Sequence, residues 1–321
     1  MDGDVGGSES GSLMPHPLAP SRALSAGGGW GKGRGTMLGR RATFWTLYLP
    51  PLFWLGVFFL APLVLMAAFS FRADASGGIL EGWTPTLKQY ADLFTAGTYW
   101  RLLGVSVLMA LVVAVCATAL AYPVAYFLAF RAGIRAGFYL LLLLVPFWTS
   151  YLLRVMAWKI MLGSNGVINS FLIYAGLIDE PLPALLYNRN AVVVTLIYVW
   201  IPFAALPILA ALQRIDLALF DAAGDLGATP FRRFWRVTLP LSLPGMLAAF
   251  FMVFIPTVGE YVTPLLVGGS QGSMYGNIIQ DFFSKAANWP LGSALSMIML
   301  VVTLALVALA VRLVDVRRLI E

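Results

Sequence analysis

The chain has 321 residues, of which 60% are hydrophobic and only 11% are charged, and its formal net charge is +6. Globular proteins carry about 25% charged residues, so this composition excludes an ordinary soluble domain. With a mean hydropathy of +0.83 and several apolar runs of about 20 residues, the chain is expected to lie in a lipid bilayer. In that setting the positive charge determines orientation in the membrane, and it does not indicate nucleic-acid binding.

The N-terminal residues 1–42 are rich in Gly, Ser and Pro and have too few apolar side chains to form a core. We expect them to be a disordered leader. A glycine run at 27–33 is reminiscent of a phosphate-binding loop, but Lys32 is followed by Gly33 rather than by Ser or Thr. The chain therefore offers no ATP site of its own.

The remainder, 43–321, is predicted to be an all-α membrane domain with six transmembrane helices. The apolar runs place these spans at about 43–71, 101–130, 136–160, 191–212, 241–266 and 291–311. Six spans put both termini on one side of the membrane. About two thirds of the 21 Lys and Arg residues fall on that side, which predicts that the termini and the loop 213–240 are cytoplasmic.

The single cysteine and the single histidine bear on possible chemistry. Cys116 lies inside an apolar run, so an intramolecular disulfide is impossible, and His16 lies in the polar leader. The spans contain no histidine and no spacing typical of metal ligands. We therefore expect no metal site and no catalytic centre, and an intramembrane enzyme is only a remote alternative.

The most polar run in the second half of the chain lies between spans four and five. Asp216 is suited to cap a helix over about 217–226, and Gly227 is suited to end it in a left-handed conformation. Thr229 and Pro230 then form the start of a second, short helix. The sequence predicts a helix-turn-helix loop.

The second of these helices is amphipathic. Its apolar side chains are Phe231, Phe234 and Trp235, and its basic side chains are Arg232, Arg233 and Arg236. Such a segment either binds a partner protein or lies on the membrane surface. The residues alone leave both interpretations open.

The spacing of this loop resembles the EAA signature of membrane subunits in bacterial ABC importers. The matching residues are Asp221, Ala222, Ala223, Gly227, Val237, Leu239 and Pro240, with Asp in place of Glu and Val in place of Ile. The resemblance implies a permease subunit whose loop 213–240 is the coupling helix that contacts the ATP-binding subunit. It assigns that contact to Asp221, Ala222, Ala223, Gly227, Arg232, Arg233, Leu239 and Pro240.

The same resemblance implies the partners and the location. ATP and Mg would be bound by a dimer of separate ATP-binding subunits, so this chain would carry no cofactor and would not be an enzyme. A second homologous permease subunit, expected to be a different chain, would complete the pathway. A periplasmic solute-binding protein would deliver the substrate to the bacterial inner membrane. A channel or a secondary transporter would leave the loop 213–240 without a partner.

Three further segments are similar to spermidine/putrescine permeases. The first segment comprises 146–150, Arg154, Trp158 and 165–169. The second is 254–261, and the third is 286–290. The resemblance implies a polyamine or a related small organic cation as the substrate.

A small group of residues is expected near the substrate path: Trp148, Tyr151, Arg154, Trp158, Glu260 and Tyr261. Glu260 either attracts a cationic amine or is a structural carboxylate, hydrated or paired with Arg154 or Lys159. The aromatic rings either bind ammonium groups or simply lie at the membrane interface. Because Arg154 and Lys159 would repel a cation, an opine, an amino-acid derivative or another anionic or zwitterionic solute remains an alternative substrate.

Overall fold

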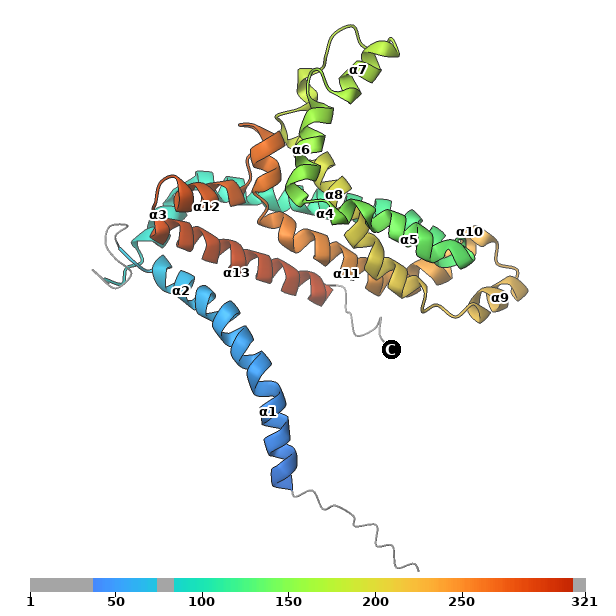
Figure 1. Cartoon of the computed structure of the whole chain (residues 1–321), viewed down its shortest axis with the longest axis horizontal. Helices are drawn as coiled ribbons and strands as arrows, with labels where there is room; N and C mark the ends of the chain where they lie inside the picture. The colour runs from blue at the N-terminus through green and yellow to red at the C-terminus, as the bar shows by residue number, and fades with distance from the viewer. Residues whose placement is uncertain (1–36, 74–83, 314–321) are drawn as a thin grey trace, which may run out of the picture. The chain divides into compact units, whose positions relative to one another are not determined.

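The computed structural model describes residues 37–73 and 84–313, and within these ranges the chain is almost entirely helical (Figure 1). The helices are α1 (Met37–Leu55), α2 (Ala61–Ser70), α3 (Lys88–Thr95), α4 (Gly97–Phe130), α5 (Ala136–Leu144), α6 (Tyr151–Leu162), α7 (Val167–Tyr174), α8 (Arg189–Leu212), α9 (Ala218–Asp225), α10 (Pro230–Arg233), α11 (Leu239–Val258), α12 (Tyr275–Ser284) and α13 (Trp289–Leu313). Short 3₁₀ and π segments join several of them.

The expected leader falls largely outside the described residues, because the structure begins at Met37. There α1 starts a few residues before the predicted boundary at 43. A π-helical turn at Gly56–Leu60 leads from α1 into α2, and Trp45–Ser70 is long and apolar enough to be the first span. The chain divides into two compact units after Gly56, and every contact described below lies in the second unit.

Five helices of the described residues can cross a membrane, and a broken pair raises the number to six. The predicted third span, 136–160, is the broken one, since 133–148 and 151–174 meet at 87°. The prediction of one continuous helix there is wrong. Pro146 lies in a 3₁₀ turn, and the Thr149 hydroxyl donates to the Pro146 carbonyl at 2.6 Å, which competes with helical hydrogen bonding.

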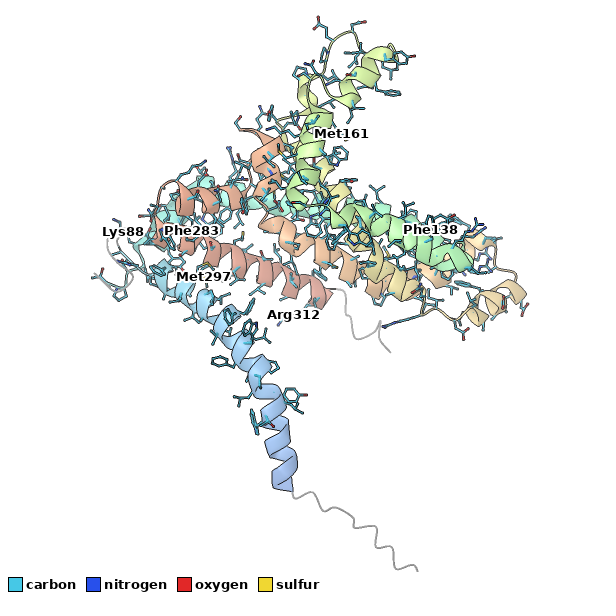
Figure 2. All side chains as sticks on the ribbon, viewed as in Figure 1. Lys88, Phe138, Met161, Phe283, Met297 and Arg312 are labelled. Carbon is cyan, nitrogen blue, oxygen red and sulfur yellow. The ribbon has the colours of Figure 1, made fainter. Side chains whose placement is uncertain are left out.

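The two halves of this broken span are visible in Figure 2, where Phe138 marks α5 and Met161 marks α6. In Figure 1, α5 runs alongside the other long helices, whereas α6 and α7 project away from them. The segment between the predicted third and fourth spans thus contains a helix, α7.

The fifth span also differs from the prediction of 241–266. The helical chain begins at Pro230, passes through a π turn at Phe234–Thr238 and ends at Val258, so it forms one candidate span of 29 residues. A break follows, and a separate π turn covers Pro264–Gly268. The second helix of the 213–240 loop is therefore continuous with the fifth span rather than a short separate helix.

The core lies where α4, α8 and α11 pack together, and it is built from small residues. Along α4 the buried residues include Ala110, Ala114, Ala117, Ala121 and Ala125, each fully inaccessible to solvent. Small side chains allow helices in a membrane to approach closely, and close packing is the main attraction between them there.

Gly245 on α11 shows how close this approach is. A Cβ atom added to Gly245 would lie 2.7 Å from the Pro207 carbonyl oxygen of α8. One turn earlier on α11, the hydroxyl of Ser242 lies 3.0 Å from that of Tyr122 on α4, and both are buried. The three helices thus form one tightly packed group.

A second, smaller core lies near the end of the bundle where α3 and α12 are found. It contains the buried residues Leu93, Leu103, Tyr275, Ala294 and Leu295. In Figure 1 this end lies opposite to α9 and α10. The bundle therefore separates the 213–240 loop from the segments around α12.

Candidate functional site

The 213–240 loop begins directly after α8 and folds by local hydrogen bonds. Asp216 Oδ1 accepts from the backbone N–H of Ala218 at 2.9 Å, at the start of α9. Asp216 thus bonds a first-turn amide, as predicted, but the N-cap position is Leu217 and α9 covers Ala218–Asp225 rather than 217–226.

Gly227 ends α9 as predicted, with φ at +74°. Its N–H donates to the Gly224 carbonyl at 2.8 Å, and the Ala228 N–H donates to the Ala223 carbonyl at 2.9 Å. This pair of bonds is the Schellman motif, in which a left-handed residue satisfies the free carbonyls at a helix end. The corner of the loop therefore depends on a backbone conformation that glycine adopts without strain.

The next helix starts as predicted at Thr229 and Pro230. The Thr229 side chain accepts from the Arg232 N–H at 3.4 Å, and Pro230 occupies the first helical position. Proline needs no hydrogen-bond acceptor at that position and its backbone angle is already helical. These features fix where the helix begins and hence where its side chains point.

The loop exposes a group of apolar side chains. Leu226 is 89% exposed, Phe231 is 74% exposed and Trp235 is 53% exposed. Phe234 differs, because its ring packs edge-on against Tyr122 and Tyr126 of α4 at 5.8 and 6.0 Å. The predicted apolar ridge is thus divided: Phe231 and Trp235 are accessible to a partner, whereas Phe234 attaches the loop to the bundle.

The two arginines assigned to coupling also differ. Arg233 lies over the Phe220 ring at 5.4 Å and donates to the Phe220 carbonyl at 3.4 Å, which ties the two helices of the loop together. Arg232 is exposed, as are Asp221, Ala222 and Pro240. Leu239 and Ala223 are half-buried. The predicted coupling residues therefore include both accessible and structural positions.

A second candidate region forms where two helix breaks meet. One break separates the 3₁₀ turn at Val145–Trp148 from α6, and the other separates α11 from the π turn at Pro264–Gly268. The Tyr151 hydroxyl and Thr263 Oγ1 are 2.6 Å apart and join these breaks. Broken helices inside a membrane are tolerated where they are buried in protein or line a cavity, so this junction is a candidate for the transport path.

Glu260 lies in the second break and is half-buried. Its Oε1 accepts from the backbone N–H groups of Val262 and Thr263 at 2.8 and 3.1 Å. It makes no ion pair with Arg154 or Lys159 in the described part of the chain. Of the alternatives left open for this carboxylate, pairing with Arg154 or Lys159 is not seen; the carboxylate instead caps the free N–H groups of the following turn.

The cationic groups of Arg154 and Lys159 lie over aromatic rings. The Arg154 guanidinium lies 5.4 Å from the Phe147 ring centre and 6.0 Å from that of Tyr151. The Lys159 ammonium lies 5.8 Å from the ring centre of Tyr187. Arg154 thus lies near the face of Tyr151, one of the rings expected to bind a substrate ammonium group, whereas Lys159 lies over a ring outside that group.

The remaining predicted path residues are more dispersed. Trp158 packs against Tyr198 of α8 with ring centres 5.3 Å apart. Trp148 is 77% exposed and Tyr261 is 42% exposed. The structure therefore brings Tyr151, Arg154 and the Glu260 segment together, while Trp148 is a surface residue and Trp158 a packing residue.

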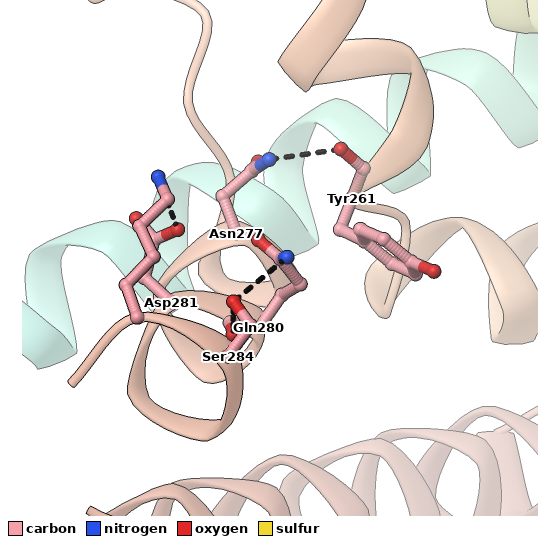
Figure 3. Close-up of polar contacts among 6 residues, drawn as sticks. Tyr261, Asn277, Gln280, Asp281 and Ser284 are labelled. Atoms are coloured by element: carbon pink, nitrogen blue, oxygen red, sulfur yellow. Dashed lines mark hydrogen bonds and ion pairs between the residues drawn. The ribbon is translucent and has the colours of Figure 1, made fainter. Parts of the chain in front are cut away.

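The helix α12 holds the second break in place. Asn277 donates from its amide to the Tyr261 carbonyl at 2.8 Å (Figure 3). Gly276 packs directly on the break, since an added Cβ would lie 2.7 Å from the carbonyl oxygens of Gly259 and Glu260. These contacts, together with Thr263, were missed from the sequence; the Thr263-Pro264 pair is a helix-start signal that could have indicated the break.

The acidic, cysteine and histidine side chains of the described residues do not gather into a metal site. No group of three or more His, Cys, Asp or Glu side chains suited to a metal ion occurs in the described ranges. What the site does present is an exposed helical loop at one end of a bundle of membrane-spanning helices. This combination defines a multi-pass membrane protein.

The family follows from comparison with known proteins. Residues 26–320 match the family model described as binding-protein-dependent transport system inner membrane component. The chain belongs to this family, and it is the membrane component of a transport system.

Several curated relatives are similar over most of the chain. The spermidine/putrescine transport system permease protein PotB of Haemophilus influenzae is 34% identical over 76% of this chain and 84% of its own length. The PotB protein of Escherichia coli K12 is 34% identical over 78% of this chain and 90% of its own. The inner membrane ABC transporter permease protein YdcU of E. coli K12 is 31% identical over 83% and 88%.

The fold has solved counterparts. A chain of a bacterial ABC transporter involved in the import of the acidic polysaccharide alginate superimposes with a TM-score of 0.68. The match covers 89% of this chain and 98% of that chain at 18% identity. At this identity the likeness establishes the fold alone, which is that of an ABC transporter permease.

Proposed function

We propose that this chain is one of two permease subunits of an ATP-driven importer of polyamines such as spermidine and putrescine. The observation that carries the substrate class is the similarity to the two PotB proteins, which extends over about three quarters of the chain. The chain itself binds no nucleotide, and ATP with Mg is hydrolysed on a separate dimer of ATP-binding subunits.

The 213–240 loop is the contact with that ATP-binding subunit. Phe231 and Trp235 supply accessible apolar area, and Arg232 adds a positive charge beside them. Exposed aromatic and arginine side chains are the residues that most often dominate binding energy at protein interfaces. The left-handed turn at Gly227 and the helix start at Thr229 give these side chains a defined backbone position.

This assignment fixes the orientation in the bacterial inner membrane. The loop 213–240 and both termini face the cytoplasm, in agreement with the distribution of Lys and Arg. The opposite end, with α3 and α12, faces the periplasm and the solute-binding protein. A second, different permease subunit completes the pathway, because six spans form only half of it.

The junction of the two helix breaks lies on the substrate path in this proposal. Glu260 supplies its negative charge there, and Tyr151 and Tyr261 are its aromatic neighbours. The capping hydrogen bonds use one carboxylate oxygen, Oε1, and they leave the charge of the group in place. A buried carboxylate attracts a cationic amine more strongly than an exposed one, because it is less screened.

An anionic or zwitterionic solute is the second candidate. Arg154 favours it, because a fixed guanidinium close to the junction attracts negative charge. A relative described as a putative 2-aminoethylphosphonate transport system permease protein is 26% identical over 49% of this chain. The cation–π contacts of Arg154 with Phe147 and Tyr151 weigh against this candidate, because they give the guanidinium a structural role.

The deciding experiment is ATPase stimulation in the reconstituted complex with its solute-binding protein. Spermidine and putrescine are compared with anionic and zwitterionic solutes at equal concentration. We expect stimulation by the polyamines alone. Stimulation by an amino acid or opine, with none by polyamines, would retain the importer assignment and overturn the substrate.

A further inference from the structure

A polar cavity lies at the end of the bundle opposite to the 213–240 loop. It has a volume of about 580 Å³ and is lined by Arg101, Asn188, Arg189, Asn190, Gln271 and Ser273, among others. Arg101 lies in the first turns of α4, and Arg189 is the first residue of α8. Gln271 and Ser273 belong to the chain that leads into α12. Three segments distant in sequence thus form one cavity.

The cavity is positively charged. None of the described residues that line it carries a carboxylate. Arg189 Nε donates to the Gln271 carbonyl at 2.9 Å, which holds the guanidinium at the cavity and leaves its terminal nitrogens available. The start of α8, capped by Asn188, adds the positive end of a helix dipole. The cavity therefore suits a negatively charged group.

Two arginines at one place are unusual on this side of the protein. Basic residues are fewer here than at the opposite end, and most of them are engaged. Lys285 forms an ion pair with Asp281 at 2.8 Å, and Arg154 and Lys159 lie over aromatic rings. Arg101 and Arg189 instead share a cavity whose lining, among residues 37–73 and 84–313, includes no carboxylate. A cationic substrate would be repelled there, so this cavity does not serve the polyamine.

We propose that this cavity, formed by Arg101 and Arg189, receives a carboxylate side chain of the solute-binding protein and anchors that protein on the permease. The inference rests on the proposed function, which places this end of the bundle in the periplasm. Two guanidinium groups with free N–H donors match a carboxylate in both charge and geometry. Charge complementarity of this kind speeds association and fixes the orientation of the two partners.

The test is a titration of the full reconstituted complex with its substrate-loaded binding protein. The readout is the concentration that gives half-maximal ATPase stimulation at low and high salt. Arg101→Glu is expected to raise this concentration about tenfold at low salt and to flatten its salt dependence, because a screened attraction has been removed. Lys88→Glu is the matched control, with the same charge change on the same side but outside the cavity; it should change the value less than about twofold.

The outcomes separate the inference from the proposed function. Equal effects of Arg101→Glu and Lys88→Glu, or an unchanged titration for Arg101→Glu, would overturn the anchor while the importer assignment stands. Failure of the binding protein to stimulate the wild-type complex would instead contradict the proposed function. An effect of Arg101→Glu that follows the anionic lipid content of the bilayer, with no change in affinity for the binding protein, would assign the cavity to a lipid headgroup and overturn the anchor. A carboxylate-to-lysine change on the binding protein that restores affinity to Arg101→Glu would establish the contact.

Discussion

The 213–240 loop and the junction of the two helix breaks are built in opposite ways. In the loop, Asp216, Gly227 and Thr229 each bond to backbone groups within a few residues, so the segment shapes itself and leaves Phe231 and Trp235 exposed. At the junction, Tyr151 and Thr263 meet across 112 residues of sequence. The difference shows that the exposed loop is shaped locally, whereas the junction inside the bundle depends on contacts between distant segments.

The largest effect is expected from Gly227→Val, which disturbs the left-handed backbone at the corner of the loop. At φ +74° a β-branched side chain costs on the order of 1–3 kcal/mol, and the corner should shift to relieve this strain. We expect ATP-driven uptake to fall about 100-fold while the protein still inserts and ATP hydrolysis continues. The measurement is uptake and hydrolysis in the same proteoliposomes.

Gly224→Ala is the matched control for this change. Gly224 lies inside α9 with nothing within 4 Å of an added Cβ, so alanine should be tolerated or slightly stabilising. Equal losses of uptake in both variants would show that loss of any glycine here is harmful, and the argument from the left-handed corner would fail.

The next effect separates the two faces of the loop. Phe231→Ala removes an exposed ring and should weaken binding of the ATP-binding subunit about 30-fold, as for an interface residue worth about 2 kcal/mol. Phe234→Ala removes a ring packed on Tyr122 and Tyr126 and should instead lower the unfolding free energy by about 2 kcal/mol. Pull-down affinity and thermal unfolding in detergent measure the two quantities. If Phe231→Ala lowered the unfolding free energy and Phe234→Ala weakened binding of the ATP-binding subunit, the assignment of the two rings to different faces would be refuted.

At the junction, Glu260→Gln is designed to separate charge from hydrogen bonding. Glutamine keeps the Oε1 acceptor that caps Val262 and Thr263, so the fold should be retained. Loss of the negative charge should raise the KM for polyamine uptake about tenfold. Asp281→Asn, which removes a carboxylate near α12, is the control and should leave KM within about twofold. An unchanged KM for Glu260→Gln would make this carboxylate purely structural.

The smallest effect concerns the bond between the two breaks. Tyr151→Phe and Thr263→Val each remove one hydroxyl of a pair 2.6 Å apart. Each should lower the unfolding free energy by about 1 kcal/mol, and the double variant should cost little more than either single one. Thermal unfolding of the four proteins completes the double-mutant cycle. Fully additive losses would mean that the two hydroxyls do not act together.

The same comparison explains what the sequence could predict. The corner at Gly227 and the helix start at Thr229 depend on neighbouring residues, and both expectations are confirmed. The family and the number of spans follow from composition and motif spacing. The bend after Trp148 and the capping role of Glu260 were not predicted, because apolar runs do not reveal where a helix breaks inside a membrane. Such details depend on packing against segments far away in the sequence.

The unbroken helical run from Pro230 to Val258 has a mechanical consequence. Its 29 residues span on the order of 44 Å, from the corner at Thr229 to the residue before the second break. A rod of this length that tilts by about 10° about one end moves its other end by about 8 Å, from the same helical rise. If the loop is the contact with the ATP-binding subunit, a push on its outer surface would pass along this one helical run, through its π turn, to the chain that carries Glu260 and Thr263. The helical run would act as a lever that converts a displacement of the loop into a rearrangement at the second break.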